Sequence, residues 1–219
     1  MLFAATGNTA YRTYFDNNYT SIRPYNWTYW YAFQPTIQDI MLYYASLPNA
    51  TSSVANNIKN SCTTSTNTNN ADMLPAWSNN TDAYRAYLKN SDYVWGCNRW
   101  KANAANIYNN MVKYNLYPSN NTIYTNAAES YLHFLHGANP INKVMLTNMG
   151  DYGAENSCDE MYHAWFGDGT DYDNAETSLY GPPPGYVTGG FNPTFVPEQG
   201  MYISPPQDLP HQKSYKDWN

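Results

Sequence analysis

Charged side chains make up only 13% of the 219 residues, and no stretch gathers Lys and Arg into a cluster. The 17 acidic and 11 basic residues give a formal charge of −6, so a nucleic acid partner lacks its electrostatic footprint. No apolar run approaches the ~18–20 residues of a membrane span, and the N-terminal Met-Leu-Phe-Ala-Ala-Thr lacks the charged region of a signal peptide. We therefore expect neither nucleic acid nor membrane as a partner, and any export signal is expected outside this chain.

Cysteine is also scarce, and its spacing indicates no metal site. Cys62, Cys97 and Cys158 lie far apart, and an odd number of cysteines cannot pair fully within one chain. Their number leaves the redox compartment and the disulfide state open. The sequence contains no GxSxG, HExxH, P-loop or dinucleotide fingerprint, so none of the sites that these motifs mark is indicated.

Aromatic residues, in contrast, are abundant. They form 17% of the chain, with 23 Tyr and 7 Trp. Tyr and Trp combine a flat apolar face with a polar edge, which suits partly exposed binding surfaces. Any single Tyr is more often packed between helices than placed in a site. The surplus as a whole favours a protein with an aromatic-lined cleft.

Apolar residues recur at helical spacing through the first part of the chain. Three stripes predict amphipathic helices: Ile37, Ile40, Met41, Tyr44 and Ala45; Ala104, Ile107, Tyr108, Met111 and Val112; and Tyr124, Ala128, Tyr131 and Leu135. The first begins after Pro35 and ends at Pro48-Asn49, and the third stops at Gly137. Shorter helices are predicted around Ala10–Asn17, Val54–Lys59 and Asp82–Lys89, and the polar stretch Ser61–Asn70 is predicted to be an exposed loop.

From Asn139 onward helical periodicity ends, and Gly, Pro, Asp and aromatic residues dominate. The run from Gly181 to Gly190 holds three consecutive prolines and is too rich in turns for a helix or a central strand. A loop region this long is typical of a functional surface on a rigid scaffold. We predict a helical part at 1–138 and a site-bearing loop region at 139–219.

The loop region holds the residues that could carry chemistry. His163 lies among aromatic residues, although a lone His is more often structural. Glycoside hydrolysis needs two carboxyl groups, one as acid and one as base or nucleophile, and spacing alone selects no pair. Asp168, Asp171 and Asp173 form a loose oxygen-donor group without the EF-hand pattern, so solvated loop acids are the favoured interpretation. The remaining loop acids are Asp151, Glu155, Asp159, Glu160, Glu176 and Asp217.

Several short segments together resemble glycoside hydrolase family nine, the cellulase family with a six-hairpin helical barrel. The segment Tyr131–Pro140 is similar to the family's helix end and G-x-N-P turn. Thr147–Gly150 and Tyr162–Trp165 are similar to its histidine region. The remaining matches are Gly181–Asn192 with its Pro/Gly substrate loop, Tyr215–Asp217 with the start of its second signature, and Trp95–Asn98 with a W-G-S-N segment bordering the cleft.

The resemblance implies an all-α fold, the C-terminal part of an (α/α)6 barrel with long ordered loops, so residues 1–219 would form one partial glycoside hydrolase catalytic domain. It implies an inverting endo-β-1,4-glucanase that is secreted, needs no cofactor and binds a β-1,4-linked glucan, with calcium left open for the whole domain. His163 would hold a substrate hydroxyl, and Asp217 would neighbour the acid and base. The implied substrate-binding residues are Trp95, Asn98, Tyr162 and Trp165.

The chain departs from the family pattern at three points. Trp165 stands where the His-x-Arg motif has Arg. The D-A-G-D motif of the catalytic base is absent, and the general acid should follow Asp217 by about nine positions, whereas the sequence ends at Asn219. We therefore expect this chain to be inactive without the remainder of its catalytic domain. The alternatives are a non-catalytic β-glucan-binding module and a related barrel enzyme acting on xyloglucan or mixed-linkage glucan.

Overall fold

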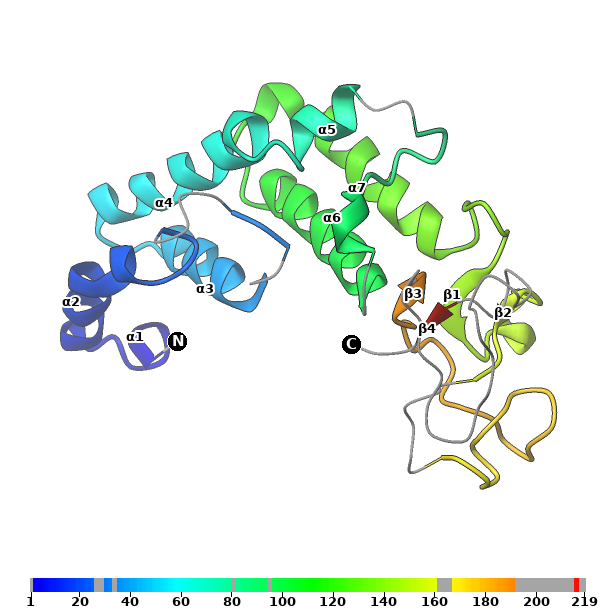
Figure 1. Cartoon of the computed structure of the whole chain (residues 1–219). Coiled ribbons are helices and arrows are strands. Elements are labelled where there is room, and N and C mark those ends of the chain that lie inside the picture. The colour runs from blue at the N-terminus through cyan, green and yellow to red at the C-terminus, as the bar shows by residue number, and fades with distance from the viewer. Residues whose placement is uncertain are drawn as a thin grey trace. The chain divides into compact units, whose positions relative to one another are not determined.

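The computed structural model describes residues 2–25, 30–32, 35–79, 82–93, 96–160 and 167–191, and the backbone of 215–216. Helices dominate the chain as far as Leu135, and short strands and turns follow (Figure 1). The helices are α1 (Leu2–Thr6), α2 (Thr9–Asn18), α3 (Pro35–Ser46), α4 (Ser52–Thr64), α5 (Leu74–Asn79), α6 (Cys97–Lys113) and α7 (Asn121–Leu135). The strands are β1 (Val144–Thr147), β2 (Ser157–Cys158), β3 (Gly190–Phe191) and β4 (Tyr215–Lys216). No helix in the described ranges is long and apolar enough to cross a membrane.

The chain forms two compact units. The first unit comprises Met1–Thr81 and Asn103–Glu129, and the second comprises Asp82–Ala102 and Ser130–Asn219. Helices α6 and α7 therefore each contribute residues to both units.

Apolar periodicity predicted most of the long helices correctly. Helices α2, α3, α4, α6 and α7 cover the predicted segments, and α7 ends as Gly137 requires. Gly137 has a φ of 106°, and the amide of Ala138 donates to the carbonyl of His133 at 2.9 Å, which is the six-to-one bond of a Schellman cap. The buried face of α3 differs from the predicted apolar stripe. Gln38, outside the stripe, is 2% exposed, whereas Ile40, within it, is 40% exposed.

The prediction of an exposed loop at Ser61–Asn70 is wrong. Helix α4 runs on to Thr64, and a π-helix follows from Ser65 to Asn69. Ser65 is 2% and Asn70 5% exposed, because both side chains bind the backbone of Trp30. Ser65 Oγ accepts from the Trp30 amide at 2.6 Å, and Asn70 Nδ2 donates to the Trp30 carbonyl at 2.8 Å. Tertiary hydrogen bonds thus make buried structure from residues that are polar by composition.

The helix predicted at Asp82–Lys89 is also absent. The Asp82 carboxylate instead accepts from the amides of Tyr84 at 2.9 Å and Ala86 at 3.1 Å, and Arg85 adopts a positive φ of 53°. A side chain that binds nearby backbone amides in this way offers the chain an alternative to helix formation. The segment is therefore extended, and only Asn90–Asp92 forms a 3₁₀ turn.

The core of the first unit lies where α3 and α4 meet the later helices. Its fully buried side chains include Met41, Ile58, Tyr108, Met111 and Tyr124. The rings of Tyr108 and Tyr124 stack with their centroids 6.4 Å apart, which holds α6 against α7 within this unit.

A carboxylate joins α3 to α6 inside the first unit. Asp39 accepts from Asn110 Nδ2 at 2.6 Å and from Asn106 Nδ2 at 3.3 Å. The two amide donors compensate the partly buried carboxylate for lost water, so the contact orients the helices without a buried ion pair.

We predict that none of the three thiols reacts rapidly in the folded protein. Cys62, Cys97 and Cys158 are present as thiols and are at most 1% exposed, and burial raises the pKa of Cys62 and of Cys97 to about 12. Because the thiolate is the reactive form, a disulfide reagent should label no thiol quickly under native conditions and three after denaturation. Rapid labelling of even one thiol in the folded protein would contradict this burial.

Candidate functional site

The Gly/Pro-rich loop of the second unit is held along β1. The amide of Thr147 donates to the Tyr186 carbonyl at 2.9 Å, and the amide of Gly185 donates to the Thr147 carbonyl at 2.8 Å. Further along, the amide of Thr188 donates to the Met145 carbonyl at 3.0 Å, and an antiparallel bridge joins Leu146 to Val187. The loop is therefore ordered by pairing with β1, although its prolines keep it from forming a regular strand.

Side chains from the end of β1 complete this attachment. Thr147 Oγ1 donates to the Pro183 carbonyl at 2.6 Å, and Asn148 Nδ2 donates to the carbonyls of Tyr180 and Pro182 at 3.1 and 2.8 Å. Gly181 lies so close to the chain that an added Cβ would come within 2.7 Å of Ala175 Cα. These contacts fix the position at which the loop leaves the preceding segment.

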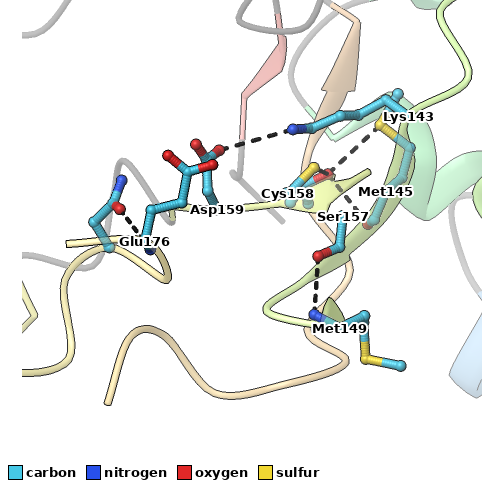
Figure 2. A network of polar contacts seen from close by, with 9 residues as sticks. Lys143, Met145, Met149, Ser157, Cys158, Asp159 and Glu176 are labelled. Carbon is cyan, nitrogen blue, oxygen red and sulfur yellow. Dashed lines mark hydrogen bonds and ion pairs between the residues drawn. The ribbon is translucent and has the colours of Figure 1, made fainter. Parts of the chain in front are cut away.

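A second set of polar contacts holds β2 and the residues around it (Figure 2). Ser157 Oγ accepts from the Met149 amide at 2.9 Å, and Lys143 Nζ lies 3.8 Å from Asp159 Oδ1. An antiparallel bridge pairs Glu160 with Asn174. These contacts hold the described backbone in place up to residue 160, directly before the predicted histidine segment.

The first turn of α6 contacts the other end of the loop. Asn98 is fully buried, and its Nδ2 donates to the Thr188 carbonyl at 3.0 Å. Its amide donates to the Gly189 carbonyl at 3.1 Å, and Cys97 Sγ donates to the Phe191 carbonyl at 3.2 Å. Asn98 therefore binds protein backbone here, and its direct contact with a glucan stays a prediction.

Lys101, one helical turn further along α6, is completely buried. Its Nζ donates to the carbonyl of Ala86, lies 3.4 Å from Tyr93 Oη and sits 4.0 Å from the centroid of the Phe134 ring. The ammonium group thus ties the extended 82–93 segment to α6 and α7 through a carbonyl and a ring face.

Burial has a measurable consequence for this lysine. Desolvation lowers the pKa of Lys101 to about 8, although the neighbouring Cys97 and Asp82 act in the opposite direction.

A cavity of about 390 Å³ opens between these same elements of the second unit. Its lining is aromatic or apolar except for the carboxylate of Asp82. The lining residues are Asp82, Tyr84, Tyr93, Phe134, Pro140, Ile141 and Phe191. Phe134 meets Tyr84 and Phe191 edge to face, with centroids 6.4 and 6.2 Å apart. A volume of this size, with apolar walls and few polar groups, is typical of small-ligand sites.

Most of the residues selected from the sequence lie outside the described part of the chain. His163, Asp217, Trp95, Tyr162 and Trp165 all belong to this group. The residues that organise the described site are Thr147, Asn148, Lys101 and Tyr84. The first two belong to a motif that the sequence analysis named, whereas nothing in the local sequence marks Lys101 or Tyr84.

The acidic turn around Asp171 has its own local contacts. Asp173 Oδ2 accepts from the Gly169 amide at 2.9 Å, and the Asp171 carbonyl accepts from the amides of Tyr180 and Gly181. Within the described ranges, no three His, Cys, Asp or Glu side chains gather as a metal site.

Comparison with known proteins decides the family. The model of glycosyl hydrolase family 9 matches residues 1–219. The chain belongs to glycosyl hydrolase family 9. No curated protein matches the chain. The chain is similar in structure to a Zn-binding triple mutant of the GH family 9 endoglucanase J30, with a TM-score of 0.64, 19% identity and 87% of the chain covered.

This family 9 chain spans only 31% of the length of that endoglucanase structure. The predicted fold class, a C-terminal part of an (α/α)6 barrel with long ordered loops, is confirmed by this likeness and by the helical architecture.

We predict that Lys101 makes stability depend on pH in alkaline solution. Its pKa is lower in the folded state (about 8) than the ordinary value of 10.5, so the unfolded chain binds more protons between these values. The contribution of Lys101 to the free energy of unfolding should therefore rise with pH across that window, by roughly 3 kcal/mol at most. The buried thiols of Cys62 and Cys97 act with the opposite sign above their ordinary pKa of 9.0, because the folded chain keeps their protons.

Denaturant unfolding at several pH values measures this effect. The difference in unfolding free energy between wild type and Lys101→Met should grow by this amount across the window, because Met fills the same space without a titrating group. The difference between wild type and Lys113→Met, at an exposed position of the same helix, should stay constant. An identical pH dependence in wild type and Lys101→Met would show that another group is responsible.

Proposed function

We propose that the complete protein is a β-1,4-glucan hydrolase of the cellulase type, and that this chain supplies loops that bind the glucan. Membership in glycosyl hydrolase family 9 over the full 219 residues is the observation that carries the proposal. The structurally similar protein is described as an endoglucanase, which agrees with this substrate class. A polymeric substrate of this kind is met outside the cell, so we propose an extracellular location for the complete protein.

The proposed reaction inverts the configuration at the sugar and needs a general acid and a general base on opposite sides of the scissile bond. In this proposal His163 holds a substrate hydroxyl and Asp217 lies beside the acid and base. The base-bearing D-A-G-D motif does not occur in the 219 residues, and no Glu follows Asp217. The described residues therefore contribute substrate positioning, and the proton transfers depend on groups beyond this sequence.

The aromatic cavity gives the loops a means of binding sugar. Tyr84 is 38% exposed at its wall, and Phe191 is partly exposed opposite the end of α7. The C–H faces of a glucosyl ring can pack on such aromatic faces while its hydroxyls remain hydrated. We propose that this cavity takes one part of the glucan chain.

We predict that the 219-residue protein binds a soluble β-1,4-glucan without cleaving it. Binding is expected because the cavity and loops lie within the chain, and cleavage is not expected because positioning alone does not replace acid and base. Retardation in a glucan-containing native gel and release of reducing ends measure the two effects. Sustained release of reducing ends by the purified protein would overturn the proposed inactivity, and binding without hydrolysis in the complete protein would favour a binding module.

We predict that Tyr84→Ala weakens glucan binding. Loss of one stacking face costs about 0.5–1.5 kcal/mol, which corresponds to a roughly two- to tenfold rise in Kd. Calorimetric titration with a soluble cello-oligosaccharide checks this value. Tyr152→Ala is the matched control, because Tyr152 is 70% exposed in the same unit and does not line the cavity. Equal Kd values for the two variants would show that the cavity is not part of the glucan-binding site.

A further inference from the structure

Residues 188–190 are buried, and only Gly190 of these belongs to a strand, the two-residue β3. Thr188 is fully buried, and Gly189 and Gly190 are buried beside it. Buried carbonyl groups need hydrogen-bond donors, because an unpaired one costs free energy. Cys97 and Asn98, about ninety residues earlier in the chain, donate to the carbonyls of Thr188, Gly189 and Phe191.

Gly190 lies against these two donors more closely than any other residue type allows. Its φ is 93°, and an added Cβ would come within 2.5 Å of Asn98 Cγ and 2.6 Å of Asn98 Oδ1 and Cys97 Sγ. Asn98 cannot move aside, since its amide and its side-chain nitrogen both hold the loop. Glycine is therefore required at position 190 for two separate reasons, backbone conformation and space.

Burial of the Asn98 side chain has an energetic cost. Oδ1 is buried and finds no hydrogen-bond donor within the described ranges. An unpaired buried oxygen costs about 1–3 kcal/mol, which an apolar side chain of similar size would avoid. The amide donor to the Thr188 carbonyl compensates for this cost, so the side chain serves the loop.

We propose that Asn98 is a positioning residue, which sets where the 181–191 loop meets the glucan by binding Thr188 and by fitting against Gly190. This inference rests on the proposed function for its substrate, and on the described contacts alone for the attachment of the loop. Asn98 thus acts on the substrate through the loop, without touching it.

Hydrogen exchange of the Thr188 amide tests the attachment in the 219-residue protein. Asn98→Leu removes the donor to the Thr188 carbonyl and keeps the branched shape of the side chain. Thr188 should then separate more often from Met145, to whose carbonyl its amide donates, and this amide should exchange roughly five- to tenfold faster. Asn103→Leu is the matched control on the same helix, because Asn103 Nδ2 also donates to a backbone carbonyl, that of Ala32, at 2.8 Å. The control should leave exchange at Thr188 unchanged. Equal Thr188 exchange in wild type and Asn98→Leu would overturn the proposal.

Substitutions at two glycines distinguish the effect of a steric clash from the effect of backbone strain. Gly185→Ala and Gly190→Ala both place a side chain at positive φ, 82° and 93°, but the nearest atom to a Cβ at position 185 is Met149 Sδ, at 3.8 Å. We expect Gly190→Ala to accelerate Thr188 exchange at least tenfold more than Gly185→Ala does. Adding Asn98→Ala to Gly190→Ala should recover part of this difference, because it removes the clashing Cγ and Oδ1. Absence of both effects would overturn the fit between Asn98 and Gly190.

Kinetics of the complete protein on a soluble β-1,4-glucan tests the consequence for the substrate. Asn98→Leu should lower kcat/KM at least tenfold, and Asn103→Leu should keep it within about twofold. Faster loop exchange with unchanged kcat/KM would overturn the positioning role while leaving the attachment in place. A wild-type complete protein that hydrolyses no β-glucan would instead overturn the proposed function, and the exchange measurements would still decide the attachment.

Discussion

The second unit depends on the hydrogen bonds made by the first turn of α6. A helix N-terminus has backbone amides without intrahelical partners, and the helix holds them in fixed positions. Here the amide of Asn98, with its side chain and the Cys97 thiol, binds carbonyls of residues 188–191. One turn later Lys101 binds Ala86 from the same helix. A single regular element therefore fixes two segments that have almost no regular structure of their own.

Asparagine side chains make many of the polar contacts that position α6 against its neighbours. Along α6, the side-chain amides of Asn98 and Asn103 bind the backbone carbonyls of Thr188 and Ala32, and those of Asn106 and Asn110 share the carboxylate of Asp39. A neutral amide can be buried at a lower desolvation cost than a charged group, and it donates and accepts with one side chain. A chain with few charges can thus still fix its helices and loops by specific polar contacts.

Periodicity predicted α2, α3, α4, α6 and α7 because their buried faces are apolar at helical spacing. It failed at residues 61–70 and at Asp82–Lys89, where distant or local hydrogen bonds override composition: Ser65 and Asn70 bind Trp30, and Asp82 binds its own following amides. Motif resemblance identified the correct family, and it selected Asn98 and the Gly181–Asn192 loop. It could not show that they meet, since no local pattern links residues ninety positions apart.

The difference between contact and position matters for how such motifs are interpreted. A residue in a motif beside a cleft invites the conclusion that it binds substrate, yet Asn98 has no exposed surface with which to do so. The proposed glucan-binding role of the 181–191 loop would benefit from a loop held in one conformation before the substrate arrives, because ordering it during binding would weaken affinity. The prolines at 182–184 restrict the loop from within, and β1 and α6 restrict it at its two ends. Burial of Asn98 is therefore consistent with influence on the substrate, exerted through the backbone that it holds.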